Sequence, residues 1–317
     1  MNKPLLKHLT DFLEYGEIEK GLSPITIKNY SRFLQRFFEW LDTHNLANIS
    51  PSELTEKHVW QYRVWLSRLP NTARKSYTNL NTSTQTRYLI ALRAFLAYFQ
   101  EKNIPSLPTE KIKLPKEHKE RRVKCLSLEQ IERLFDSIDV SKTSGVRDRA
   151  IIEVLFSTGT RVAELVSLDK KQIDGFKPGR DLEISIIGKG SYVRTVYFSP
   201  RAILWVKKYL ATRTDDDPAL FIRFKGPTSD NLRLTTRAIE EIVQKHARFA
   251  GLPVLATPHT LRHSFATDLL NEGVDLRAVQ EFLGHKNIAT TQVYTHVTNK
   301  RLKDIHQKYH GGRKLSG

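Results

Sequence analysis

The stretch TPHTLRHSFATDLL, residues 257–270, places two histidines and an arginine close together. The threonine–proline pair at its start is typical of the first positions of a helix. His259 and His263 are four residues apart, a spacing that sets two metal ligands on one helix face. His259 and Arg262 are three residues apart, and near a helix N-terminus, where N–H groups lack partners, they could bind a phosphate instead. The stretch alone therefore predicts either a metal site or an anion site.

The rest of the chain argues against a metal. A metalloprotease helix needs a glutamate beside its first histidine as general base, and Thr260 occupies that place here. His285 is the only attractive third ligand. The one cysteine, Cys125, excludes an internal disulfide and a multi-cysteine metal cluster, and it suits a reducing cytoplasm. We therefore favour the anion site and predict no metal and no cofactor.

The composition indicates a polyanionic partner. The 317 residues include 51 Lys and Arg against 34 Asp and Glu, for a net charge of +17. Residues 1–116 and 117–317 are both basic, which favours DNA held between two domains over a loosely tethered basic tail. No apolar run is long enough to cross a bilayer. Composition alone would also fit a ribosome-associated protein, a membrane-surface protein or a basic surface without a special partner.

Apolar residues at helical spacing predict a small helical bundle over residues 1–103. One helix is expected near residues 5–15, and others within 22–44, 49–69 and 82–102. Serine–proline pairs that begin at Ser23 and Ser50 predict the starts of the second and third helices. The apolar stripes of the second and fourth helices contain Ile27, Tyr30, Leu34, Phe37, Phe38 and Leu41, and Leu89, Leu92, Phe95, Leu96 and Phe99.

Four arginines of this first domain lie off the apolar stripes. Such residues are usually solvated, but in a DNA-binding domain they could contact phosphates. On that basis we predict DNA contacts for Arg32, Arg36, Arg87 and Arg93.

A linker and a second domain follow. Residues 104–124 contain three prolines and many charges without a period, which predicts a linker. The second domain is expected over residues 125–310, with a capping-box pattern at Ser127 and Gln130, and a disordered tail over 311–317. Its predicted elements are a β-hairpin over 182–198 around a Gly-Lys-Gly-Ser turn, and helices within 199–213, 235–251, 257–273 and 275–284.

Further polar residues could join the anion site. Arg161 follows a glycine that breaks a hydrophobic helix, Lys189 lies at the hairpin tip, and Tyr294 follows His285 on a short helix. Each has an ordinary explanation, such as an ion pair between Arg161 and Glu164 three residues on. Together they suit phosphodiester transfer. Arginines and a histidine stabilise the phosphate oxygens without magnesium, a lysine protonates the departing oxygen, and a tyrosine attacks and holds the strand.

Four segments, taken in order, resemble the tyrosine recombinase (phage integrase) family and are most similar to its bacterial Xer branch. They are STGTRVAELVSLD (157–169), IIGKGSYVRTV (186–196), TPHTLRHSFATDLLNEGVDLRAVQEFLGH (257–285) and TTQVYTHV (290–297). The resemblance implies a two-domain, mainly α-helical protein. A SAM-like helical core-binding domain would precede an α+β catalytic domain with a small antiparallel β-sheet, and the two would close around duplex DNA.

The resemblance also implies a role for each site residue. Arg161 and Arg262 resemble the arginines that clamp the scissile phosphate, and Glu164 resembles the acidic residue that supports the site. His263 has no catalytic counterpart, and we expect it to pack or to lie on the surface. The other implied roles are a general acid for Lys189, assistance in proton transfer for His259, a phosphate contact for His285, and the nucleophile that forms a 3′-phosphotyrosyl link for Tyr294.

Partners and process follow from the same resemblance. It implies a homo- or heterotetramer that binds two duplexes and passes through a Holliday junction. It also implies a cytoplasmic role in chromosome dimer resolution, and therefore in chromosome partition and cell division. A septal DNA translocase could activate the protein in that role. Residues 299–309 would dock on a neighbouring protomer or pack on their own domain. The segment 70–83 is longer and more polar than the Xer pattern leads us to expect, and it could contact DNA.

Three alternatives remain open at this stage. The chain could integrate or excise a mobile element or a phage. It could be a catalytically silent DNA-binding accessory protein, although the complete catalytic set argues against this. It could also be a relaxing enzyme similar to a type IB topoisomerase, which uses the same nucleophile chemistry without a tetramer.

Overall fold

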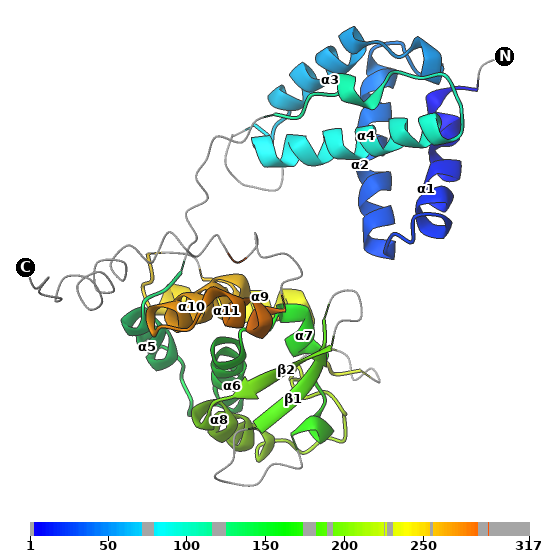
Figure 1. The fold of residues 1–317 in the computed structure, drawn as a ribbon. Coiled ribbons are helices and arrows are strands. Elements are labelled where there is room, and N and C mark those ends of the chain that lie inside the picture. The colour runs from blue at the N-terminus through cyan, green and yellow to red at the C-terminus, as the bar shows by residue number, and fades with distance from the viewer. Residues whose placement is uncertain are drawn as a thin grey trace, which may run out of the picture. The chain divides into compact units, whose positions relative to one another are not determined.

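The computed structural model describes residues 3–71, 79–115, 125–173, 182–188, 193–224, 226, 231–253, 256–284 and 291. The chain divides into two units, Met1–Glu120 and Arg121–Gly317, and each is described by itself (Figure 1). Within the described ranges, no helix combines the length and the apolar composition needed to cross a membrane.

Over its described residues, the first unit is a bundle of four α-helices with an aromatic core. Predicted stripe residues of the second and fourth helices, from Leu34 to Leu41 and from Leu89 to Phe99, are buried, which confirms the helical spacing. Phe37 packs against the rings of Trp40 and Tyr62. The helices are α1 (Leu9–Ile18, preceded by the 3-10 turn Leu5–His8), α2 (Pro24–Thr43), α3 (Glu56–Arg68) and α4 (Thr82–Glu101).

The predicted start of the third helix is wrong. Ser50 and Glu53 form a reciprocal capping box around the 3-10 turn Pro51–Glu53, and Leu54 then returns to an extended conformation. The α-helix α3 begins only after Thr55, whose hydroxyl accepts a hydrogen bond from the His58 amide. Two N-capping side chains lie close together in the sequence, and the first one caps only a single short turn.

The stretch predicted as a linker is packed over its first half. Ile112 is 2% exposed, and Ile104, Leu107 and Leu114 pack against the core of the first unit. A 3-10 turn, Thr109–Lys111, lies between them. Prolines interrupt the helical period here, but single apolar residues between them still cover the bundle. Residues 116–124, the rest of the predicted linker, lie outside the described residues.

The second unit is mainly helical with one antiparallel pair of strands. The Ser127–Gln130 capping box is present, and the two strands of the predicted hairpin pair with Leu182 opposite Phe198. Residues 189–191 of the predicted turn lie outside the described residues. This arrangement confirms the predicted fold class. Its elements are α5 (Leu128–Asp136), α6 (Thr143–Thr158), α7 (Val162–Val166), a 3-10 turn (Lys170–Gln172), β1 (Leu182–Ile187), β2 (Val193–Phe198), α8 (Pro200–Leu210), α9 (Thr236–Phe249), α10 (Pro258–Asn271) and α11 (Leu276–Leu283).

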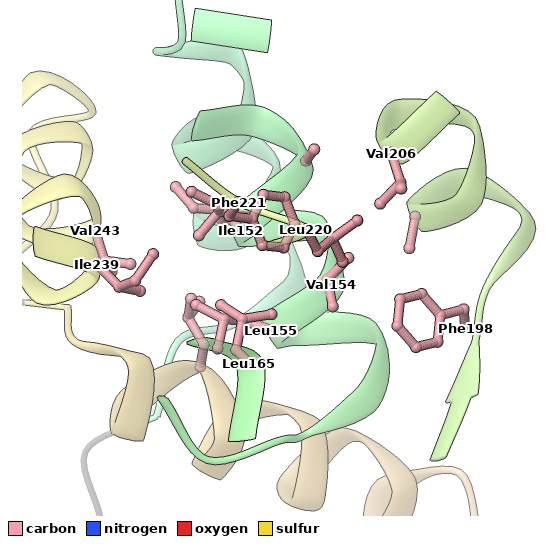
Figure 2. Packing of buried hydrophobic residues seen from close by; sticks show 14 of the residues in the cluster. Ile152, Val154, Leu155, Leu165, Phe198, Val206, Leu220, Phe221, Ile239 and Val243 are labelled. Atoms are coloured by element: carbon pink, nitrogen blue, oxygen red, sulfur yellow. The ribbon is translucent and has the colours of Figure 1, made fainter. Parts of the chain in front are cut away.

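Helix α6 forms the centre of this unit. Its residues Ile151, Ile152, Val154 and Leu155 are fully buried, because α8, α9, α10 and β2 surround the helix. The side chains of Ile152, Val154 and Leu155 point to different sides of it (Figure 2). Apolar side chains that point to different sides of a helix are stable only when each of those sides is covered. The carboxyl end of α6 is therefore held firmly in the core, and the candidate site begins at that end.

Candidate active site

A glycine ends α6 and turns the chain into the site. Gly159 adopts the left-handed conformation, with φ of +58°, and its N–H bonds to the Leu155 carbonyl. A Cβ atom at this position would lie 2.4 Å from the ring of Phe265 on α10. Only glycine combines this backbone conformation with so close an approach. The turn places Arg161 at the N-cap of α7.

Glu164 is the centre of an ion-pair network on α7. Its carboxylate accepts the Arg161 backbone N–H at 2.7 Å and the Arg161 Nη1 at 2.8 Å. It also accepts both terminal nitrogens of Arg194, at 2.9 and 2.8 Å. Burial alone would raise the pKa of Glu164, but hydrogen bonds and charge from the two arginines outweigh it and hold the pKa at about 2. The carboxylate is therefore ionised at neutral pH.

Arg262 enters the site from the first turns of α10. Thr257 caps this helix and Pro258 is its first residue, as the sequence predicts. The side chain of Arg262 is buried, and it donates to the carbonyl oxygens of Gly159 and Leu283, each at 2.5 Å. Arg262 thus joins the end of α6 to the end of α11.

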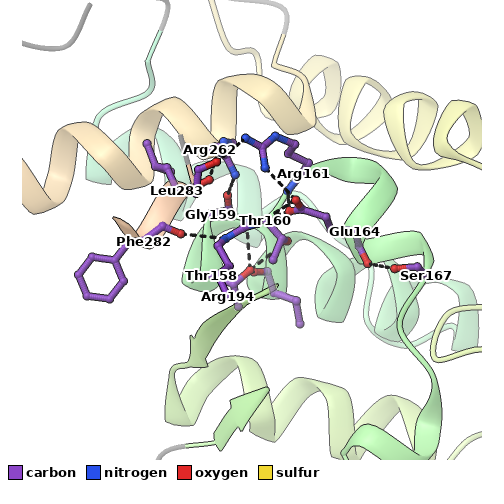
Figure 3. A network of polar contacts seen from close by, with 12 residues as sticks. Thr158, Gly159, Thr160, Arg161, Glu164, Ser167, Arg194, Arg262, Phe282 and Leu283 are labelled. Atoms are coloured by element: carbon purple, nitrogen blue, oxygen red, sulfur yellow. Dashed lines mark hydrogen bonds and ion pairs between the residues drawn. The ribbon is translucent and has the colours of Figure 1, made fainter. Parts of the chain in front are cut away.

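Three arginines converge on the carboxyl end of α11 (Figure 3). Their acceptors are the carbonyl oxygens of three consecutive residues, which have no partners within the helix. The C-terminal end of a helix carries a partial negative charge, so it attracts cations. The bonds are Arg194 Nε to Phe282 at 3.1 Å, Arg262 Nη2 to Leu283 at 2.5 Å and Arg161 Nη2 to Gly284 at 3.2 Å.

The two histidines of α10 lie next to this cluster. The rings of His259 and His263 are 4.1 Å apart between centroids. Burial of part of its ring, followed by the positive charges of Arg262 and Arg161, lowers the pKa of His259. Burial, with His259 and Arg262, lowers the pKa of His263 to about 4. His259 is exposed and His263 is half-buried, so at neutral pH His259 is an accessible neutral base and His263 packs beneath it.

The arrangement suits an anion. The Arg161 side chain is about a third exposed, so part of it is accessible to solvent beside the buried cluster. Among the described residues, no three His, Cys, Asp or Glu side chains are grouped to hold a metal ion. Positive charge, oriented guanidinium donors and a neutral histidine form a site that can bind a phosphodiester and accept a proton.

The remaining predicted site residues have different outcomes. Lys189, His285 and Tyr294 lie outside the described residues, and their places stay predictions. In the first unit, Arg32 and Arg87 are exposed and Arg93 is partly exposed. The fourth arginine of that set, Arg36, is partly exposed and pairs with Glu39 at 2.6 Å.

Arg194 is the site residue that the sequence analysis missed. It is 7% exposed and lies on β2 at a position that faces inward. An arginine at an inward position of an alternating strand is the signal that could have found it, because a buried guanidinium requires partners. Its partners are Glu164 and the end of α11.

Comparison with known proteins gives consistent matches along the chain. The model of the phage integrase family matches residues 124–301, and that of the phage integrase N-terminal SAM-like domain matches residues 9–103. Tyrosine recombinase XerD of Listeria monocytogenes serotype 4b (strain F2365) is 35% identical over 313 residues, which cover 95% of this chain and 98% of that protein. Tyrosine recombinase XerC of Leptospira interrogans serogroup Icterohaemorrhagiae serovar copenhageni (strain Fiocruz L1-130) is 34% identical over 307 residues, 94% of this chain and 91% of that protein.

A solved structure matches the fold. The XerH site-specific recombinase, bound to a palindromic difH substrate in a post-cleavage complex, aligns with a TM-score of 0.75 and 24% sequence identity. The alignment covers 97% of this chain and 99% of that chain. This match supports the order and connection of the elements described above.

Proposed function

This chain belongs to the phage integrase family as a site-specific tyrosine recombinase of the Xer type, and we propose that it exchanges DNA strands through a 3′-phosphotyrosyl intermediate. The observation that carries the proposal is the convergence of Arg161 and Arg262 beside Glu164, because two oriented guanidinium groups suit one phosphodiester. The substrate is a recombination site in double-stranded DNA.

The proposed reaction begins with cleavage of one DNA strand. The phenolic oxygen of Tyr294 attacks the phosphorus, and its proton passes toward His259. The bond from phosphorus to the 5′ oxygen breaks, and Lys189 gives that oxygen its proton. Arg161, Arg262 and His285 hold the phosphate oxygens while charge develops on them. A 5′ hydroxyl of the partner duplex then attacks the phosphotyrosyl link, which releases Tyr294 and joins the strands through a Holliday junction.

The proposed biological role is chromosome dimer resolution in the cytoplasm. Its support is the similarity, over nearly the full chain, to proteins named tyrosine recombinase XerD and XerC. In this role the protein acts as a homo- or heterotetramer on two duplexes, and a septal DNA translocase could activate it. Integration or excision of a mobile element is the second candidate. A site that occurs once per chromosome supports the first role, and sites at the ends of an element support the second.

Covalent trapping tests the chemistry. Wild type and Tyr294→Phe are incubated with nicked duplexes built from inverted-repeat sites of the source genome, in EDTA, and analysed on denaturing gels. We expect a protein–DNA band with wild type only, while both proteins bind the duplex equally. Tyr197→Phe, an exposed tyrosine on β2, is the matched control and should form the band.

Other results would point to the alternatives. If no adduct forms although both proteins bind DNA, the proposal fails and the catalytically silent accessory protein is favoured. Relaxation of a supercoiled plasmid that lacks any recombination site would favour an enzyme similar to a type IB topoisomerase. Strong inhibition by EDTA would support a metal-dependent mechanism.

A further inference from the structure

Arg194 is buried, and it is bound to the residue that pairs with Arg161. Its side chain is 4% exposed. It forms two parallel hydrogen bonds to the Glu164 carboxylate, at 2.9 and 2.8 Å, and its Nε donates to the Phe282 carbonyl. All three nitrogens of the guanidinium group are therefore engaged inside the protein. A function of Arg194 in the reaction must act through its neighbours.

The charge balance of the cluster bears on that function. Arg161 and Arg194 are two cations that share one carboxylate, Glu164, so the three side chains carry one net positive charge. If Arg194 were neutral, Glu164 would balance Arg161 alone, and the pair would have no net charge. A buried ion pair attracts an external anion weakly, whereas an excess cation in a site of low dielectric attracts it strongly.

The local packing keeps this balance in place. A Cβ atom on Gly284 would lie 2.8 Å from the Arg194 Cδ, so the end of α11 closes tightly over the arginine. Gly284 itself has φ of +59° and accepts a hydrogen bond from Arg161. The same arginine that balances Glu164 therefore also supports the helix end to which Arg161 is bound.

We propose that Arg194 is a positioning residue of the recombinase, which offsets the charge of Glu164 and leaves the positive charge of Arg161 available to the scissile phosphate. This inference rests on the proposed function. Loss of Arg194 has two consequences, a change in net charge and a loss of packing, and substitutions can test each of them independently.

Four variants form the test. Arg194→Met removes the charge and keeps most of the volume. Arg194→Lys keeps the charge but cannot bond both carboxylate oxygens and the Phe282 carbonyl at once. The double variant Arg194→Met/Glu164→Gln restores one net positive charge without restoring Arg194. Arg147→Met is the matched control, because Arg147 is also buried, bonds Asp148 through two nitrogens and shares no partner with Arg161.

The readouts are the single-turnover rate of adduct formation on the nicked duplex, the Kd for the same DNA, and urea unfolding. We expect Arg194→Met to cleave roughly 10- to 100-fold more slowly, by analogy with buried residues that orient metal ligands, with Kd changed less than about 2-fold. The cleavage rate of Arg194→Lys should lie between the rates of Arg194→Met and wild type. The double variant should recover most of the rate, although it has lost more hydrogen bonds than Arg194→Met.

Three results would overturn the inference while leaving the proposed function intact. If Arg194→Met cleaved DNA at the wild-type rate, Arg194 would have no role in the reaction. A double variant no faster than Arg194→Met would show that packing, not charge, is what Arg194 supplies. If Arg147→Met lost as much rate and as much stability as Arg194→Met, the loss of rate would also be explained by packing and not by charge. If wild type itself forms no adduct with any site, the proposed function fails and this inference fails with it.

Discussion

Arg161 and Arg262, from distant parts of the sequence, donate hydrogen bonds to the carbonyl oxygens of adjacent residues at the end of α11. Since these two carbonyls, of Gly284 and Leu283, belong to one short piece of backbone, they limit how far the two guanidinium groups can move apart. A phosphate needs donors at a defined separation, so a shared backbone anchor is a simple way to prepare them before DNA arrives.

Arg262→Lys should reduce cleavage by 100-fold or more, since lysine cannot bond Gly159 and Leu283 together and still present donors to a phosphate. DNA affinity should change little, because this is one contact among many. Single-turnover cleavage measures the effect. Arg233→Lys is the control, since Arg233 also donates to two backbone carbonyls, those of Val166 and Leu168, but lies outside the proposed site. Equal losses in both variants would argue against a special role for Arg262.

Gly159→Ala should destabilise the second unit more than Gly251→Ala. Both glycines have positive φ, +58° and +61°, so each alanine costs about 1–2 kcal/mol of backbone strain. Only at Gly159 would the new methyl group meet a neighbour, the Phe265 ring at 2.4 Å, and overpacking should add about 1–3 kcal/mol. Urea unfolding followed by circular dichroism gives both values. Equal destabilisation would mean that the ring moves aside freely.

Stability of the second unit should fall in mild acid because of His263. Its pKa is lowered from 6.5 to about 4, so between these values the unfolded chain binds a proton that the folded chain does not. The contribution of neutral His263 to the free energy of unfolding is complete above pH 6.5 and is lost as the pH falls toward 4. Its size is on the order of 2 kcal/mol after allowance for the partial exposure of the ring. Unfolding free energies measured across this range should show the slope.

The matched variant for this pH dependence is His263→Gln, which should flatten the slope between pH 4 and 6.5. His44→Gln, in the first unit, should leave the slope of the second unit unchanged. A slope that survives in His263→Gln would assign the proton uptake to other groups, with His259 the first to test because its pKa is lowered as well.

DNA binding should weaken with salt, and the arginines of the first unit should contribute unequally. Arg32→Ala and Arg87→Ala should each reduce the slope of log affinity against log salt by about 1, as expected for a lost phosphate contact. Arg36→Ala should change it less, because Glu39 already pairs with Arg36 at 2.6 Å. Filter binding at several salt concentrations measures the slopes. Identical slopes in all three variants and wild type would remove these arginines from the DNA interface.

The fold was predictable where its signals are local. Helical periodicity and capping residues involve neighbours in sequence, so the stripes of α2 and α4 and the Ser127 cap were found correctly. The start of α3 was not, since Ser50 and Thr55 offer competing caps and packing decides between them. The packing of the segment before Ile112 was also missed, because isolated apolar residues between prolines show no period although they are partly buried against the bundle.

The site was predictable in its residue types and much less in its connections. The pairing of Arg161 with Glu164 follows from their spacing on a helix. The bonds of Arg161 and Arg262 to α11 involve backbone carbonyls, which every residue possesses and which therefore leave no mark in the sequence. Arg194 was missed because both faces of β2 carry apolar residues, so the alternation of the strand gives only a weak signal of which face turns inward.

The three bonds to the end of α11 make the alignment of the arginines depend on a segment that follows all of them in the sequence. Arg161, Arg194 and Arg262 come from separate segments, and their common anchor, Phe282 to Gly284, is the last of these parts to be synthesised. A nascent chain that stops before this anchor holds arginines without the support that aligns them, and a truncated or locally unfolded catalytic unit would be in the same condition. An enzyme that breaks and rejoins DNA would thus acquire its aligned arginines only after this anchor has been made.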